Sequence, residues 1–186
     1  MKKLFALVIS LALLMSCCAA LAETTEKTEL GSINLNGAFK LQGVIPEGYE
    51  LSIMTMDNEG MIATIRSADE TKPVMYMAIE FDEAYYDVKR MNDMTDEQIQ
   101  SIKDTFADDG DEMEFSFMET AYGTKLLVAK DKDGEVDIVV ILTVYEGYMI
   151  EFDMVTGPAA TETLTEAQIQ MCVDFLSDLD FIPEEA

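Results

Sequence analysis

The chain has no histidine, and only three of its 186 residues are cysteines. Without an imidazole there can be no histidine-based nucleophilic triad, no histidine-ligated zinc site and no His-Glu-x-x-His motif. The Ser-x-x-Lys, Asp-Thr-Gly, Asp-Ser-Gly and Gly-x-x-x-x-Gly-Lys patterns are missing too. Among common devices, only paired carboxylates remain open. We therefore expect no enzyme activity, no cofactor, and no catalytic, cofactor-binding or metal-ligating residue that can be assigned.

Two of the cysteines lie in the first 22 residues, which resemble a secretory signal peptide. Lys2 and Lys3 precede an apolar run over residues 4–15, and Ala20-Leu21-Ala22 has the small residues of a cleavage site. The run is shorter than the ~20 residues that a membrane-spanning helix needs. We predict cleavage after Ala22 and a secreted or extracytoplasmic protein.

A lipid anchor is the alternative. Leu14-Met15-Ser16-Cys17 resembles a bacterial lipobox, in which the cysteine is lipidated and becomes the new N-terminus. The protein would then be anchored at Cys17. On either interpretation we expect no transmembrane segment in the mature chain, because its longest strongly apolar run is 138–144.

Positive charge is scarce. The chain has 12 basic and 37 acidic residues, a net charge of −25. Removal of residues 1–22 takes away two lysines and no acid, which leaves 10 − 37 = −27. Such a charge repels nucleic acid and anionic lipid. We expect no nucleic-acid partner, whereas metal cations, basic peptides or a well-solvated surface all fit.

Cys172 is the single cysteine that remains after processing, so no internal disulfide can form. It lies among Ile169, Val173 and Leu176, at the spacing of one face of a helix. We predict a buried, unreactive thiol.

The mature chain is the length of one domain. We predict a polar linker over residues 23–30 and a single domain over residues 31–186, with ordered structure from about Ile33. Alternating apolar residues, turn residues and glycines predict strands. The expected strands cover 38–44, 49–56, 61–66, 74–81, 112–119, 125–130, 135–145 and 148–155.

Two helices are expected, each opened by a capping box. Thr95 with Gln98 begins one that ends near residue 108, and Thr165 with Gln168 begins another that ends near residue 179. The two helix entries, 94–100 and 164–170, are nearly identical in sequence. An old duplication and the same capping solution reached twice both explain this.

Strands followed by helices predict an α+β fold, with an antiparallel sheet of about six or seven strands packed by two main helices. Two helices cannot cover both faces of such a sheet. Part of one face is then exposed or covered by the loop 82–93, and we expect a ligand there. Tyr85 and Tyr86 in that loop suggest either a packed lid or an exposed aromatic contact patch.

Three segments are candidate metal sites. Met54 with Met56 and Met75 with Met77 place thioether pairs on strand faces, and Met91 and Met94 follow. Thioethers select Cu(I), although the same spacing is that of buried strand positions. The turn 131–137 resembles part of a calcium-binding EF-hand loop without its first and last ligands, and 108–112 is a dense acidic cluster. Both also fit solvated turns.

Several short motifs resemble the PsbP-like fold family, whose members include photosystem II extrinsic subunits, a Ran-binding import factor and exported bacterial proteins. They are 39–41, Pro46-Glu47-Gly48-Tyr49, 120–125, 145–148 and 181–183. Tyr49 stands where the family usually has tryptophan. The resemblance implies a PsbP-like sandwich and a binding or accessory role, and transfers no functional residue.

These observations together predict an exported, non-catalytic binding or accessory domain whose partner is a protein or small ligand, with its identity and the oligomeric state open. A metal carrier for Cu(I) or calcium is the alternative. A two-carboxylate hydrolase is the second alternative.

Overall fold

The structure is a computed structural model that describes residues 27–33, 39–56, 60–108, 113–131 and 137–183. The predicted signal peptide, the lipobox and most of the acidic turns lie outside these residues.

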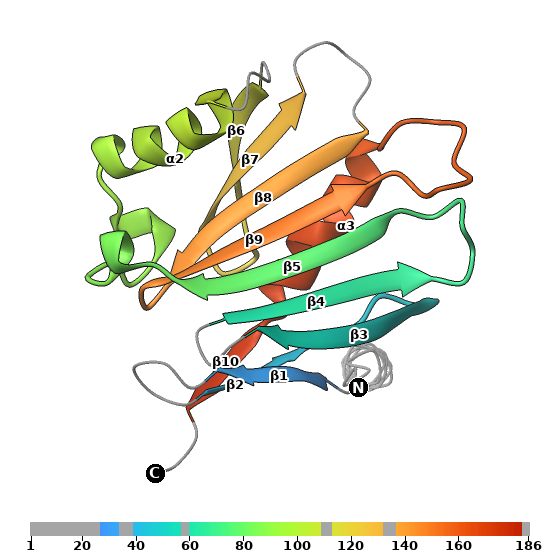
Figure 1. Cartoon of the computed structure of the whole chain (residues 1–186), viewed down its shortest axis with the longest axis horizontal. Helices are drawn as coiled ribbons and strands as arrows, with labels where there is room; N and C mark the ends of the chain where they lie inside the picture. The colour runs from blue at the N-terminus through green and yellow to red at the C-terminus, as the bar shows by residue number, and fades with distance from the viewer. Residues whose placement is uncertain (1–26, 34–38, 57–59, 109–112, 132–136, 184–186) are drawn as a thin grey trace, which may run out of the picture.

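Within these described residues, ten strands form two antiparallel sheets, and two α-helices and two short 3-10 helices pack against them (Figure 1). The strands are β1 (Thr28–Ile33), β2 (Phe39–Gly43), β3 (Tyr49–Met56), β4 (Gly60–Ser67), β5 (Val74–Phe81), β6 (Met113–Glu119), β7 (Lys125–Asp131), β8 (Ile138–Tyr145), β9 (Tyr148–Val155) and β10 (Asp180–Pro183). The helices are η1 (Glu83–Tyr85), η2 (Met91–Asp93), α2 (Asp96–Asp108) and α3 (Glu166–Ser177).

The larger sheet has seven strands in the order β3-β4-β5-β9-β8-β7-β6, and the smaller one has the order β1-β2-β10. Helix α3 and the smaller sheet cover one face of the larger sheet, and Figure 1 shows α3 behind it. On the opposite face, α2 and the segment 85–94 cover only β7 and β8 and their neighbours. The predicted α+β class, with an antiparallel sheet of about six or seven strands and two main helices, is confirmed, and the larger sheet has seven strands.

The burial of residues along each strand shows which strands are covered on both faces. Along β9, buried and half-buried residues alternate, as in a strand with one covered face. Along β8, six consecutive residues from Val139 to Val144 are buried, because α3 lies on one side and α2 on the other. Glu146 and Gly147, with φ of 48° and 84°, form the two-residue turn between these strands.

Both capping boxes are present. The Thr165 side chain accepts from the backbone N–H of Gln168, and the Gln168 side chain accepts from the backbone N–H of Thr165. Thr95 and Gln98 make the same pair of bonds at the start of α2. Cys172 is fully buried in α3, as predicted, and burial raises the pKa of its thiol far above the usual value.

One predicted boundary was wrong, and one strand was not predicted. Strand β1 begins at Thr28, inside the expected linker, because β1 pairs with β2 and Leu30 is fully buried in the core that α3 and the smaller sheet form with the larger sheet, called the larger core below. The strand that was not predicted is β10. It pairs with β2, in a segment where the sequence suggested only the end of a helix. Loop 82–93 contains η1 and η2 and covers part of the sheet.

Candidate ligand pocket

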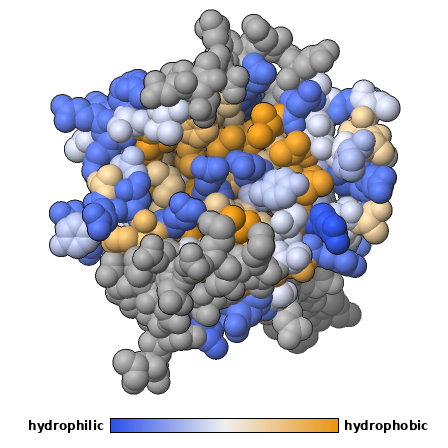
Figure 2. Space-filling model, viewed as in Figure 1, coloured by the Kyte–Doolittle hydropathy of each residue, from blue (hydrophilic) through white to orange (hydrophobic). Residues whose placement is uncertain are grey.

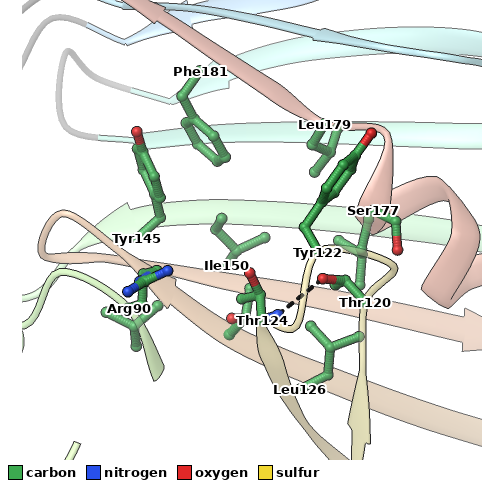
Figure 3. A pocket seen from close by; sticks show the side chains of 13 residues that line it. Arg90, Thr120, Tyr122, Thr124, Leu126, Tyr145, Ile150, Ser177, Leu179 and Phe181 are labelled. Atoms are coloured by element: carbon green, nitrogen blue, oxygen red, sulfur yellow. Dashed lines mark hydrogen bonds between the residues drawn. The ribbon is translucent and has the colours of Figure 1, made fainter. Parts of the chain in front are cut away.

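A cavity of about 140 Å³ lies where the end of α3, β10, the β6–β7 turn and the β8–β9 hairpin meet (Figure 3). Its apolar walls are Leu126, Val144, Tyr145, Ile150, Leu176, Leu179 and Phe181. Its polar residues are Arg90, Thr120, Tyr122, Thr124, Thr143 and Ser177. We refer to this cavity as the Tyr145–Phe181 pocket.

The apolar walls are an extension of the larger core. Leu126, Ile150 and Leu176 belong to that core and are buried. Tyr145 and Phe181 stack with ring centroids 4.1 Å apart and planes 21° from parallel, which joins the hairpin to β10. Figure 3 shows the Phe181 ring above the cavity and Tyr145 and Leu179 on opposite sides of it.

The β6–β7 turn is held by its own hydrogen bonds and by α3. The backbone N–H of Thr124 donates to the Thr120 hydroxyl at 3.1 Å, and the N–H of Thr120 donates to the carbonyl of Thr124 at 2.9 Å. The N–H of Ala121 donates to the hydroxyl of Ser177 in α3 at 3.2 Å. The polar rim of the pocket is therefore built on a fixed turn.

Arg90 reaches the pocket from the segment before η2. Its backbone forms an isolated bridge with Tyr145. Asn92 ties the same segment to the β6–β7 turn, because its side chain donates to the carbonyl of Gly123 at 3.0 Å and accepts from the N–H of Lys125 at 2.9 Å. The only ion pair recorded for Arg90 within the described residues joins its Nε to Asp93 at 4.0 Å, and both side chains are about half exposed.

Burial raises the pKa of Tyr145, with a smaller contribution from the charge of Glu146. Its hydroxyl therefore stays protonated at neutral pH. The pocket combines an apolar interior with hydroxyl and guanidinium groups, which is the usual composition of a small-molecule site.

The open face of the larger sheet has a different character. Figure 2 looks onto this face, where hydrophobic residues gather at the centre with hydrophilic ones among and around them. Glu80, Glu151 and Asp153 lie on β5 and β9 at this face, with Tyr76 opposite Asp153. A groove of about 430 Å³ lies at the edge of this face. Residues of both positive and negative charge line it, including Arg66, Lys72 and Glu70.

Two of these carboxyl groups have a pKa above the usual value. Burial raises the pKa of Asp153, and its Oδ1 is a buried atom with no hydrogen-bond partner among the described residues. Burial, followed by the charges of Asp153 and Glu80, raises the pKa of Glu151. Both groups lie on the open face of the larger sheet, and the two-carboxylate hydrolase stays a prediction.

The candidate methionines whose side chains the structure describes lie in two separate cores. Met75 and Met77 are fully buried in the larger core, and Met91 and Met94 are buried under α2, so these four pack as core residues. The side chains of Met54 and Met56 lie outside the described part, as do residues 109–112 and 132–136. Within the part that is described, no three acidic or cysteine side chains are arranged to hold a metal ion.

Each of the two interpretations of loop 82–93, a packed lid and an exposed aromatic patch, fits one of its two tyrosines. Tyr85 is buried in the second core, which α2 and the segment 85–94 form with β7 and β8, whereas Tyr86 is 66% exposed. The ligand expected on the uncovered face stays a prediction, since the apolar pocket lies on the face that α3 covers.

The amino-acid sequence by itself marks none of the pocket residues as a binding site. Three of the segments with PsbP-like motifs, 120–125, 145–148 and 181–183, nevertheless meet at the pocket. Their short turn and aromatic signals mark positions in the fold, but they do not show that the three ends face one another.

No helix in the described residues has the length and apolar character to cross a membrane. No protein-family model matches the chain, and no curated protein matches it. The PsbP-like resemblance therefore remains a prediction.

Proposed function

We propose that the chain is a non-catalytic binding domain that holds a small molecule in the Tyr145–Phe181 pocket. The observation behind this proposal is the apolar cavity of about 140 Å³ at the edge of the larger core. A protein cavity of about 150 Å³ lined by apolar side chains binds benzene. The pocket thus has room for one ring or a short branched chain.

The position of the pocket supports binding in preference to a packing defect. Protein interiors are close-packed, and an apolar void is destabilising in proportion to its volume. Here the void opens beside a turn that hydrogen bonds fix, and hydroxyl groups and Arg90 lie around it. This arrangement orients a ligand through a few polar contacts while the walls provide the burial.

The test is a binding titration of the processed domain with small apolar probes, namely phenol, benzyl alcohol and benzoate. Saturation-transfer NMR and melting temperature are both suitable readouts. A probe at 100 times its Kd should add about 2.7 kcal/mol to the free energy of unfolding. The variant Leu179→Trp should fill the pocket and abolish binding.

Ile182→Trp is the matched control, because Ile182 is 39% exposed, lies next to Phe181 in β10 and does not line the pocket. It should bind the probes as the natural chain does. Equal binding by both variants, or no binding of any probe to the natural chain, would refute the proposal.

A further inference from the structure

The proposed pocket also contains information on the class of its ligand. Of the 186 residues in the chain, 37 are acidic, yet none of the 13 pocket residues is. The one charged residue at the pocket is Arg90, in a chain with only 12 basic residues. The residues that line the pocket therefore carry one positive charge and no negative one, on a strongly anionic protein.

The polar atoms of the pocket differ in what they can still bond. The hydroxyl of Thr143 donates to the carbonyl of Lys125 at 3.1 Å, and that of Ser177 donates to the carbonyl of Val173 at 2.8 Å. These two groups have used their hydrogens. The hydroxyl of Thr120 accepts from the Thr124 N–H, and its own hydrogen has no acceptor within the described residues.

The Thr124 hydroxyl likewise has no partner in the described part of the chain. Arg90 has five N–H donors, and its pairing with Asp93 is recorded at Nε at the long distance of 4.0 Å. Exposed ion pairs of this length contribute little. Arg90 can only donate, and the hydroxyls of Thr120 and Thr124 each keep a hydrogen to donate, so a ligand with acceptor oxygens satisfies all three groups.

We propose that the ligand is a small monocarboxylate with an apolar ring or a short branched body. Its carboxylate lies at Arg90 and the threonine hydroxyls, and its body packs against Ile150, Tyr145 and Phe181. A guanidinium matches a carboxylate through two parallel hydrogen bonds, which favours this head group over a neutral oxygen. The cavity of about 140 Å³ limits the body to about the size of a benzene ring.

This inference rests on the proposed function, and the experiment separates the two. Benzoate and benzyl alcohol have the same ring and differ in the charge of the head. Benzoate should bind about tenfold or more tightly than benzyl alcohol, and acetate, which lacks the ring, should bind about tenfold or more weakly than benzoate. Isothermal titration and chemical-shift titration measure these affinities.

Arg90→Gln should weaken benzoate binding by about tenfold or more and leave benzyl alcohol within about twofold. Arg90→Lys, which keeps the charge but loses the planar fork, should fall between the two. Arg66→Gln on the open face removes the same charge far from the pocket and should change neither affinity. The melting temperature of each variant verifies that it is folded.

If benzyl alcohol and benzoate bind equally, or if Arg90→Gln leaves benzoate unaffected while Leu179→Trp blocks both, the monocarboxylate assignment fails and the pocket proposal stands. If no probe binds, the pocket proposal itself fails. If acetate binds as tightly as benzoate, the pocket selects an anion without its apolar body, and the assignment also fails.

Discussion

Gly157 packs so closely against the backbone of the β4–β5 loop that no side chain fits between them. A Cβ atom at this position would lie 2.3 Å from the carbonyl oxygen of Glu70 and 2.4 Å from that of Lys72. Ordinary contacts of this kind begin at 3.4 Å, so the two backbone segments would have to separate by about 3.4 − 2.3 = 1.1 Å. We predict that Gly157→Ala destabilises the domain substantially.

The magnitude follows from what that separation breaks. The N–H of Ala159 donates to the carbonyl of Glu70 at 3.0 Å, and loss of this bond costs about 1 kcal/mol. Overpacking adds about 1–3 kcal/mol. Alanine reduces the entropy of the unfolded chain, which returns about 0.4–1 kcal/mol. The expected net loss in the free energy of unfolding is about 1–3.6 kcal/mol.

Urea denaturation followed by far-UV circular dichroism measures this loss. Gly123→Ala is the control, because Gly123 has a φ of +74° and nothing within 4 Å of an added Cβ. It isolates the cost of a left-handed backbone, about 1 kcal/mol. If Gly157→Ala costs less than Gly123→Ala, or less than about 0.5 kcal/mol, steric exclusion at Gly157 is refuted.

Three further predictions concern the carboxyl groups, a cap and the thiol. Burial raises the pKa of Glu151 and Asp153 in the folded state, so the folded protein holds these protons more tightly than the unfolded chain does, and stability from these two groups rises as the pH falls from 7 through their folded pKa values. Asp153→Asn should stabilise the domain at pH 7 and should flatten the dependence of its unfolding free energy on pH, as urea titrations measure. The control Asp87→Asn removes one exposed charge and should keep the pH dependence of the natural chain. The same pH dependence in both variants would contradict this prediction. Thr165→Ala removes the cap of α3 and should cost about 1 kcal/mol by thermal melting, while Thr165→Ser should keep most of it. Cys172 should react with a thiol reagent only after unfolding, because it is fully buried and burial raises its pKa; rapid modification of the native protein would show that α3 detaches from the sheet.

Much of the secondary structure could be predicted because its signals are local. A capping box satisfies backbone donors within four residues, so Thr95 and Thr165 mark their helices without any knowledge of the fold. Apolar residues and turn residues likewise predicted strands over 135–145 and 148–155, which the structure contains as β8 and β9.

The missed elements depend on distant partners. Strand β10 has four residues and no recognisable period, and it forms because β2, about 140 residues earlier in the chain, offers an open edge. Leu30 lies in a polar segment, and only the larger core gives it a reason to be ordered. Neither partner is visible in the local sequence.

Composition and spacing alone determined the absence of imidazole chemistry, the strongly negative charge, the positions of the two helices and the buried thiol. The tertiary structure decided where the two helices lie, which face of the sheet stays open, and that Arg90, Thr124, Tyr145 and Phe181 surround one cavity. The physical reason is that caps and strand periods act over a few residues, whereas the cavity is enclosed by segments that strand pairing and core packing bring together from distant parts of the chain.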